Sequence, residues 1–387
     1  MRMLLVTLYF PPATAYGGPV RSAAFVSEVI GQRGHEVQVL TTNGNGQADL
    51  GPDVGWRPFA QGVTVRYCKR WGSGLFAPRM AWDFVRSARR ADLVYVWGFF
   101  VWLMPLIVLV CRAMRLPLIV SPRGMLQPAA LQVKPVRKRL MLGVCRALGM
   151  TGLAEFHATS AEEADAVREV LGEVAGQVIP NGVEVPDAGS EGEPPLEGVA
   201  GTPYVLYLGR LHPFKQVDCL IRAAASLKRR GELGMHVCIA GAGEAGYLQT
   251  LRDLARTEGV GDDVIFVGPV EGRVKSSLLA HARALVLPSR SESFGLSVAE
   301  ALAHGTPAIA VKTAPWSGLV GNRCGWWIEE SEDELASALR EAMTMDQDRR
   351  TAMGERGRAW AAREFESSAV GARLAGWFES VAARQPT

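Results

Sequence analysis

The sequence predicts an α/β protein built from two tandem Rossmann-like, doubly wound domains. The length of 387 residues favours two domains over one. In each half, continuous apolar runs of strand length alternate with segments of helical periodicity. Residues 186–203, rich in Pro, Gly and acidic side chains, separate the halves. We therefore expect an N-terminal domain over residues 1–185 and a C-terminal domain over residues 204–366.

The N-terminal half begins with an apolar run at residues 2–8, a helical pattern at 19–32 and a second strand at 35–41. Strands that are apolar throughout are covered on both faces, so they predict a parallel sheet between helix layers. Right-handed crossovers make this sheet doubly wound. Further strands are expected at residues 63–67, 93–97 and 117–121.

The C-terminal half repeats the alternation. Strands are expected at residues 204–208, 235–240, 264–267, 284–287 and 307–311, and helices at 217–230, 247–258, 274–282, 298–303 and 332–345. Ligands of such sheets bind at the carboxyl ends of the strands. With two domains facing one another, we expect the site in the cleft between them.

Cysteine usage and hydropathy indicate a cytoplasmic protein. The six cysteines are scattered without a C-x-x-C pair, which favours reduced thiols over disulfides or zinc. The N-terminal residues show no secretory signal. Residues 93–111 are 19 residues without a charge, the length of a membrane span. Gly98 and Pro105 interrupt this run, so we interpret it as a buried strand followed by a buried helix.

Charge is unevenly distributed. Residues 1–180 carry 20 basic and 12 acidic side chains, a balance of +8; the remaining 22 and 27 give −5. The basic half suggests an anionic lipid, a phosphorylated acceptor or a nucleic acid as partner. The basic run at residues 134–139, with Arg112 and Arg115, fits an anionic membrane or an ordinary solvated helix face equally well.

The most informative motif is PSRSESFGLSVAEALA at residues 288–303. On one helix, Glu292 and Glu300 would lie about 80° apart and about 12 Å along the axis, a poor carboxylate pair. A helix that begins near Gly295 instead leaves the amides of Phe294, Gly295 and Leu296 open as an anion site.

Two further motifs follow predicted strands. In YVLYLGRLHPFKQ at 204–216, Gly209 allows close approach, and Arg210 and Lys215 suit a diphosphate. Taken alone, these could equally be two solvated cations. Gly17 and Gly18 follow the first strand like a phosphate loop, but match neither G-x-G-x-x-G nor a Walker motif.

Together these motifs, with IPNGV at 179–183 and AGAGE at 240–244, resemble the retaining glycosyltransferases of the GT-B fold. The order is similar to that of the large group-one family, which includes sucrose-phosphate synthases and bacterial polysaccharide enzymes, along nearly the whole chain. SPRGML at 121–126 and APWSGLVGNRCGWW at 314–327 resemble a branch serving exopolysaccharide or O-antigen assembly. The resemblance also implies that the last helix, 367–387, packs back on the N-terminal domain.

By this resemblance, Arg210 and Lys215 hold the donor diphosphate and Glu292 faces the sugar, which makes them the candidate catalytic residues. The implied donor-binding residues are Gly17, Gly18, Gly209, Ser293, Phe294, Gly295, Leu296 and Glu300, the last on the ribose. Neither a metal nor a cofactor is implied, because two cations and a helix terminus can neutralise the leaving group. Asp346-Gln347-Asp348 matches a D-x-D metal signature, but we interpret it as part of a polar surface helix.

The chain departs from the family where many relatives have histidines. In the segment that reads V-H-x-H-G in such relatives, Tyr95 and Trp97 occupy the positions of the two histidines. Arg123 replaces a further histidine, at a position where it could contact phosphate or acceptor. His157 is expected to be a satisfied core histidine. The acceptor-side candidates are Arg123, Lys134, Arg137 and Lys138.

The implied reaction moves a hexosyl group, with retention, from a UDP- or GDP-type sugar to a saccharide or polyprenyl-diphosphate-linked acceptor. We expect a cytoplasmic protein, peripheral to the inner face of the membrane. The alternatives are a GT-B-fold sugar-nucleotide epimerase and a nucleic-acid binder. The acidic C-terminal half disfavours the second, so no nucleic-acid partner is expected. The lack of G-x-G-x-x-G disfavours a dehydrogenase.

Overall fold

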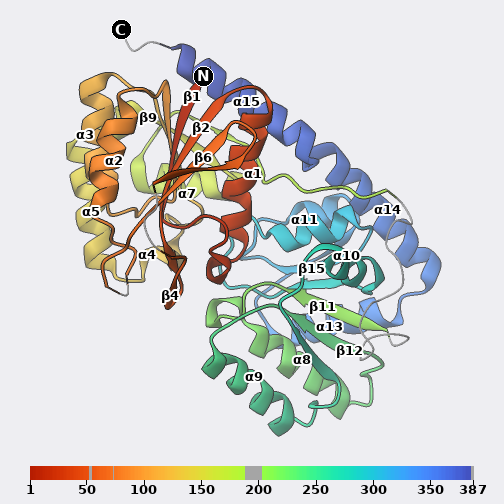
Figure 1. Cartoon of the computed structure of the whole chain (residues 1–387). Coiled ribbons are helices and arrows are strands. Elements are labelled where there is room, and N and C mark those ends of the chain that lie inside the picture. The colour runs from red at the N-terminus through yellow and green to blue at the C-terminus, as the bar shows by residue number, and fades with distance from the viewer. Residues whose placement is uncertain (52–54, 73, 188–202, 385–387) are drawn as a thin grey trace. The chain divides into compact units, whose positions relative to one another are not determined.

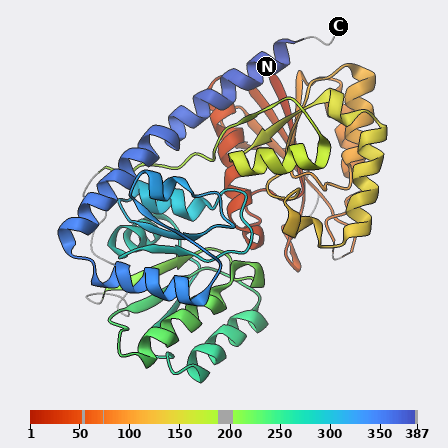
Figure 2. The ribbon, with the colours of Figure 1, turned by 180° about the vertical axis from the view of Figure 1, so that it is seen from behind.

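The computed structural model describes residues 1–51, 55–72, 74–187 and 203–384. The chain forms two compact units: Met1–Gly182 together with the residues from Ser368 onward, and Val183–Ser367. Each unit is a sheet of mainly parallel strands with helices on both faces (Figures 1 and 2), which confirms the predicted fold class. Most of the expected linker, residues 188–202, lies outside the described residues.

The first unit has an eight-stranded sheet in the order β10-β9-β8-β7-β1-β2-β6-β5. Its strands are β1 (Arg2–Thr7), β2 (Glu36–Thr42), β5 (Trp56–Ala60), β6 (Val63–Cys68), β7 (Leu93–Trp97), β8 (Leu118–Ser121), β9 (Ala154–Ala158) and β10 (Gly176–Val178). A small hairpin, β3 (Gly44–Asn45) and β4 (Ala48–Asp49), stands apart. All neighbours in the large sheet are parallel except β5, which pairs antiparallel with β6.

Alternate residues of these strands enter two separate cores, as the two-residue period of a strand requires. Leu4 and Val6 pack under α2 (Arg79–Ala88), α3 (Met104–Met114), α5 (Pro135–Ala147) and α7 (Ala161–Leu171). Met3 and Leu5 pack under α1 (Gly18–Gln32) and α15 (Ser367–Ala383). The C-terminal helix thus completes the core of the first unit. Two short helices, α4 (Pro128–Leu131) and α6 (Met150–Leu153), flank α5.

The second unit has a six-stranded, wholly parallel sheet in the order β13-β12-β11-β14-β15-β16. Its strands are β11 (Tyr204–Leu208), β12 (His236–Ala240), β13 (Val264–Gly268), β14 (Leu285–Leu287), β15 (Ala308–Val311) and β16 (Gly325–Ile328). One face is covered by α8 (Val217–Arg229), α9 (Ala245–Thr257) and α13 (Glu332–Thr344), and the other by α10 (Gly272–His281), α11 (Leu296–Ala303) and α14 (Gln347–Glu364). Helix α12 (Gly318–Gly321) precedes β16.

The structure differs from the expected elements mainly at the sheet edges. The edge strands β5, β10 and β16 were not predicted, and β5 makes the first sheet mixed rather than wholly parallel. The uncharged run at 93–111 is β7 followed by α3, as interpreted from Gly98 and Pro105. Among the described residues, no helix is long and apolar enough to cross a membrane.

Candidate functional site

The second unit has a topological switch point between β11 and β14. The chain leaves β11 for β12 on one side, and β14 starts the strands on the other. At such a point the loops after neighbouring strands diverge and leave a crevice at their carboxyl ends, where ligands of open α/β sheets bind. The loops here are residues 209–216 and 288–295, the two cation- and carboxylate-bearing motifs. The Arg290 amide donates a hydrogen bond to the Phe214 carbonyl at 3.0 Å, which joins them.

Lys215 and Glu292 meet across these two loops in an ion pair. Both side chains are largely buried, 23% and 12% exposed. Lys215 ends the short helix η2 (Pro213–Lys215), whose first turn is capped by the His212 ring as it accepts from the Phe214 amide. Glu292 holds the Lys215 ammonium in position, and the ammonium can still bind an anionic ligand.

Arg210 is exposed, and among the described residues its guanidinium has no hydrogen bond or ion pair. Its backbone is held by Tyr207, whose hydroxyl donates to the Arg210 carbonyl at 2.9 Å. Burial, reinforced by the charge of Glu292, raises the pKa of Tyr207 well above its usual value, so the hydroxyl stays a donor. Burial and then the nearby Arg210 lower the pKa of His212, which favours the neutral ring that the cap requires.

Gly209 and Gly241 pack the loops after β11 and β12 directly against each other. The Gly209 amide donates to the Ala240 carbonyl at 3.0 Å. A Cβ at Gly241 would lie 1.8 Å from the Gly209 carbonyl oxygen, so a side chain there is excluded. The strand end that carries Arg210 is therefore rigid.

Helix α11 begins at Leu296, close to the predicted start, with Gly295 in the left-handed region at φ +81°. A Cβ at Gly295 would lie 2.7 Å from Leu287 Cδ2 and 2.9 Å from Trp316 Nε1. The Trp316 indole donates to the Phe294 carbonyl at 2.5 Å, and the Phe294 ring is buried. Phe294 can thus offer a ligand its backbone but not its ring, and Ser293 precedes it in the same loop.

Glu300, one turn into α11, pairs with Lys275 of α10 at 2.8 Å. The two side chains are 16% and 17% exposed. Lys275 could not be predicted from the sequence, because it belongs to no motif and lies 25 residues from its partner. The Lys275 ammonium holds the Glu300 carboxylate in position.

The remaining predicted residues belong to the first unit. Gly17, at φ +67°, ends a short 3-10 helix and caps α1, and Gly18 begins α1 with open space around it. Lys134 immediately precedes α5 and Arg137 lies in its first turn, and both side chains are exposed. Lys138 turns inward, where its ammonium donates to the Ala130 carbonyl at 2.5 Å, and burial lowers its pKa.

Arg123 lies at the carboxyl edge of the first sheet, after β8, with φ +55°. Its guanidinium carbon is 3.4 Å from the centroid of the Trp97 ring. It donates to the Asn181 side-chain oxygen at 2.9 Å and to the Tyr95 hydroxyl at 3.2 Å, and its Nε is buried without a partner. Three side chains, two of them on β7, thus fix this cation, and it has no carboxylate partner among the described residues.

His157 is a satisfied core residue, as expected. Its Nε2 donates to the Ile179 carbonyl at 2.9 Å, so its Nδ1 accepts from the Tyr95 hydroxyl at 2.6 Å. Burial and then the charge of Arg123 lower its pKa to about 3. The ring is therefore neutral at physiological pH.

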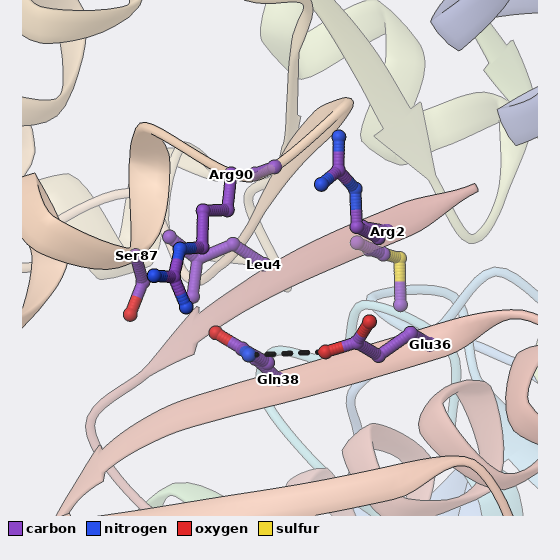
Figure 3. Close-up of a pocket in the computed structure, with 8 residues that line it drawn as sticks. Arg2, Leu4, Glu36, Gln38, Ser87 and Arg90 are labelled. Atoms are coloured by element: carbon purple, nitrogen blue, oxygen red, sulfur yellow. Dashed lines mark hydrogen bonds between the residues drawn. The ribbon is translucent and has the colours of Figure 1, made fainter.

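The described residues contain no group of three or more His, Cys, Asp or Glu that could hold a metal ion. Asp346 caps α14 by accepting from the Arg349 amide at 2.8 Å, a structural role for the D-x-D segment. A pocket of about 360 Å³ opens beside the amino-terminal ends of β1 and β2 (Figure 3), at the edge of the first sheet opposite to the carboxyl edge where Arg123 lies. Its labelled residues are Arg2, Leu4, Glu36, Gln38, Ser87 and Arg90.

Two family profiles match the chain. "Glycosyl transferase 4-like domain" covers residues 17–182, and "Glycosyl transferases group 1" covers residues 195–360. Among curated proteins, a GDP-mannose-dependent alpha-(1-6)-phosphatidylinositol monomannoside mannosyltransferase of Mycobacterium tuberculosis is 35% identical over 182 residues, 45% of this chain and 46% of the relative. A D-inositol 3-phosphate glycosyltransferase of Nocardia farcinica is 33% identical over 217 residues, 53% and 48% of the two chains. The chain spans about half the length of these relatives.

Solved structures extend the likeness to the whole fold. Sucrose-phosphate synthase of Thermosynechococcus elongatus superposes with a TM-score of 0.79 at 19% identity, covering 98% of this chain and 99% of that one. Anabaena HepE in complex with UDP-glucose gives 0.77 at 20% identity, covering 98% and 100%. The two profiles together span both units, and the chain therefore belongs to the group 1 glycosyltransferases of the GT-B fold.

Proposed function

We propose that this protein is a retaining hexosyltransferase that uses a nucleoside-diphosphate sugar. The observation that carries the proposal is the convergence, at the carboxyl ends of β11 and β14, of Arg210, the Lys215–Glu292 pair and the start of α11. Cations and a helix N-terminus at a switch point are the groups that a diphosphate needs.

In this proposal, Arg210 and Lys215 stabilise the charge that develops on the departing diphosphate. Glu292 positions Lys215 and accepts from a sugar hydroxyl, while Glu300, held by Lys275, accepts from the ribose. The acceptor hydroxyl attacks on the face from which the diphosphate leaves, and the diphosphate takes its proton. Catalysis then rests on positioning and on leaving-group stabilisation, without a dedicated enzymic base.

The names of the relatives support a UDP- or GDP-type donor, because one is called GDP-mannose-dependent and one solved structure holds UDP-glucose. We propose a saccharide or polyprenyl-diphosphate-linked acceptor in exopolysaccharide or O-antigen assembly at the cytoplasmic face of the membrane. The relatives named for inositol phosphate and phosphatidylinositol mannoside make a phospho-inositol acceptor the second candidate.

The test is nucleotide release from a panel of UDP- and GDP-sugars, with lipid-linked and phospho-inositol acceptors. Lys215→Ala and Arg210→Ala should each lower kcat/KM by about 100- to 1,000-fold, the cost of one oxyanion-hole donor. Near wild-type turnover in a folded variant, or no response to any donor, would refute the assignment. Conversion of the donor to an epimer without acceptor would favour the epimerase instead.

A further inference from the structure

The outer surfaces of α2, α3 and α5 form one continuous face of the first unit. Helix α3 packs against both α2 and α5, and all three lie on the same side of the sheet (Figures 1 and 2). Their inner residues fill the core, so the outer residues need not be apolar. We call this outer surface the α2–α3–α5 face.

Helix α5 nevertheless carries an exposed apolar stripe. Val136, Leu140 and Val144 are 78%, 68% and 39% exposed. Their spacing of four residues places them within about 80° of one another around the helix. The opposite side, with Leu142 and Cys145, already supplies the buried contacts of α5. The stripe is therefore a second apolar face, directed at solvent.

Arginines border this stripe on both sides. Arg137 follows at about 100° from Val136, and Arg139 and Arg146 lie at about 60–80° on the other side; all three are exposed. An apolar stripe between rows of arginine is the pattern of a helix that lies in a membrane interface.

The neighbouring helices continue both features. Trp82 of α2 is 71% exposed and Leu109 of α3 is 52% exposed. Exposed arginines accompany them: Arg79, Arg86, Arg112 and Arg115. Between residues 66 and 146 the acidic side chains are Asp83 and Asp92. Asp83 is buried against Arg66, and Asp92 pairs with Arg2.

We propose that the α2–α3–α5 face docks on an anionic lipid bilayer, with the apolar stripe of α5 inserted at the headgroup level. Charge complementarity favours this occupant, because the face is cationic and the bilayer surface anionic. A second copy of the chain would place arginines against arginines, a like-charge contact that disfavours self-association. The proposal concerns a surface separate from the motifs of the second unit and does not depend on the transfer reaction.

Vesicle flotation tests the proposal with the full-length protein, using phosphatidylcholine vesicles with and without phosphatidylglycerol, at low and high salt. Wild type should float with the anionic vesicles at low salt and be released by high salt. Arg139→Gln/Arg146→Gln should weaken the partition coefficient about 25-fold, since each cation near the surface contributes about fivefold. Val136→Ser/Leu140→Ser/Val144→Ser should abolish flotation.

Val320→Ser on α12 is the matched control, because this residue is 58% exposed and lies in the second unit. It should float like wild type, and all variants should melt like wild type and release nucleotide from a water-soluble donor at an unchanged rate. Wild type that fails to float at low salt, or a triple variant that floats like wild type, would overturn the proposal. The proposal would also be overturned if wild type formed a dimer, bound no lipid, and became monomeric in the triple variant. That result would assign the face to a second copy of the chain.

Discussion

Replacing Lys275 by methionine leaves the Glu300 carboxylate without the ammonium that lies 2.8 Å from it. Exposed ion pairs contribute about 0–1 kcal/mol, and loss of one partner of a fully buried pair costs about 3–5 kcal/mol. Since these side chains are 17% and 16% exposed, we expect a loss of about 2 kcal/mol. In a domain of this size, that lowers the melting temperature of the second unit by about 4–8 °C.

The same substitution should weaken binding of the donor. Glu300 is proposed to bind the ribose, a contact that is the same in the ground state and the transition state, so its loss raises KM and leaves kcat unchanged. We expect the donor KM of Lys275→Met to rise about tenfold, which corresponds to 1.4 kcal/mol. The assays are nucleotide release for kcat and KM and calorimetry for the donor Kd.

Adding Glu300→Gln separates positioning from stability. A neutral glutamine needs no counter-charge, so Lys275→Met/Glu300→Gln should regain most of the lost stability while donor binding stays weak. Lys228→Met, which breaks a pair with Asp263 that is 45% and 25% exposed, should cost about 0.5 kcal/mol and leave donor KM unchanged. A fall in kcat at constant donor KM, or recovery of donor binding in the double variant, would refute the positioning role.

Three further outcomes follow from particular geometries. Gly295→Ala should destabilise the second unit by about 3 kcal/mol, because the backbone there is left-handed and the new Cβ would lie 2.7 Å from Leu287. The control Gly305→Ala, whose Cβ would have its nearest neighbour at 3.9 Å, should cost about 1 kcal/mol. Equal free energies of unfolding for the two variants would contradict this. His157 has a pKa of about 3 in the folded state and about 6.5 in the unfolded state. As the pH is lowered from 6.5 toward 3, only the unfolded chain gains the proton, so the free energy of unfolding decreases. Chemical denaturation at roughly pH 7 and pH 5 should show wild type losing about 2 kcal/mol more than His157→Gln. Arg123→Lys removes the planar guanidinium and its stacking on Trp97, so the KM for the acceptor should rise about tenfold while the KM for the donor stays constant. A change confined to the donor KM would instead place Arg123 on the donor phosphate.

The fold was predictable where strands are buried on both faces, because a continuous apolar run then marks them. Tyr204–Leu208 and Leu93–Trp97 are of this kind, and the structure has both strands at these bounds. In the edge strand Trp56–Ala60 the first three residues, which include Pro58, are exposed, and the strand is antiparallel, so neither apolarity nor alternation reveals it. β16 is a four-residue edge strand that begins with glycine.

The site was predictable only as far as its motifs are local. The start of α11 follows from Gly295 and the apolar residues after it, and the structure has it there. Lys275 could not be found, because a pair between two helices 25 residues apart leaves no local pattern. The exposed apolar stripe of α5 could not be predicted either, although its pattern is local. Val136 and Leu140 have the spacing of a core-facing side, and the fold alone reveals that Leu142 and Cys145 occupy the core instead.

Arg210 of the second unit and Arg123 of the first unit each follow a parallel strand and have no carboxylate partner among the described residues. In the second unit Lys215 and Lys275 are paired with Glu292 and Glu300, whereas Arg210 has no such partner. In the first unit Arg123 binds neutral groups and the face of an aromatic ring, and the nearby histidine is itself kept uncharged. The Arg123 Nε is buried without a partner, so this cation costs desolvation free energy that its neutral contacts offset only in part. Arg210 is exposed and carries no such cost. Because ligands of such sheets bind at the carboxyl ends of the strands, an anionic ligand is the partner that would supply the missing counter-charge to both arginines.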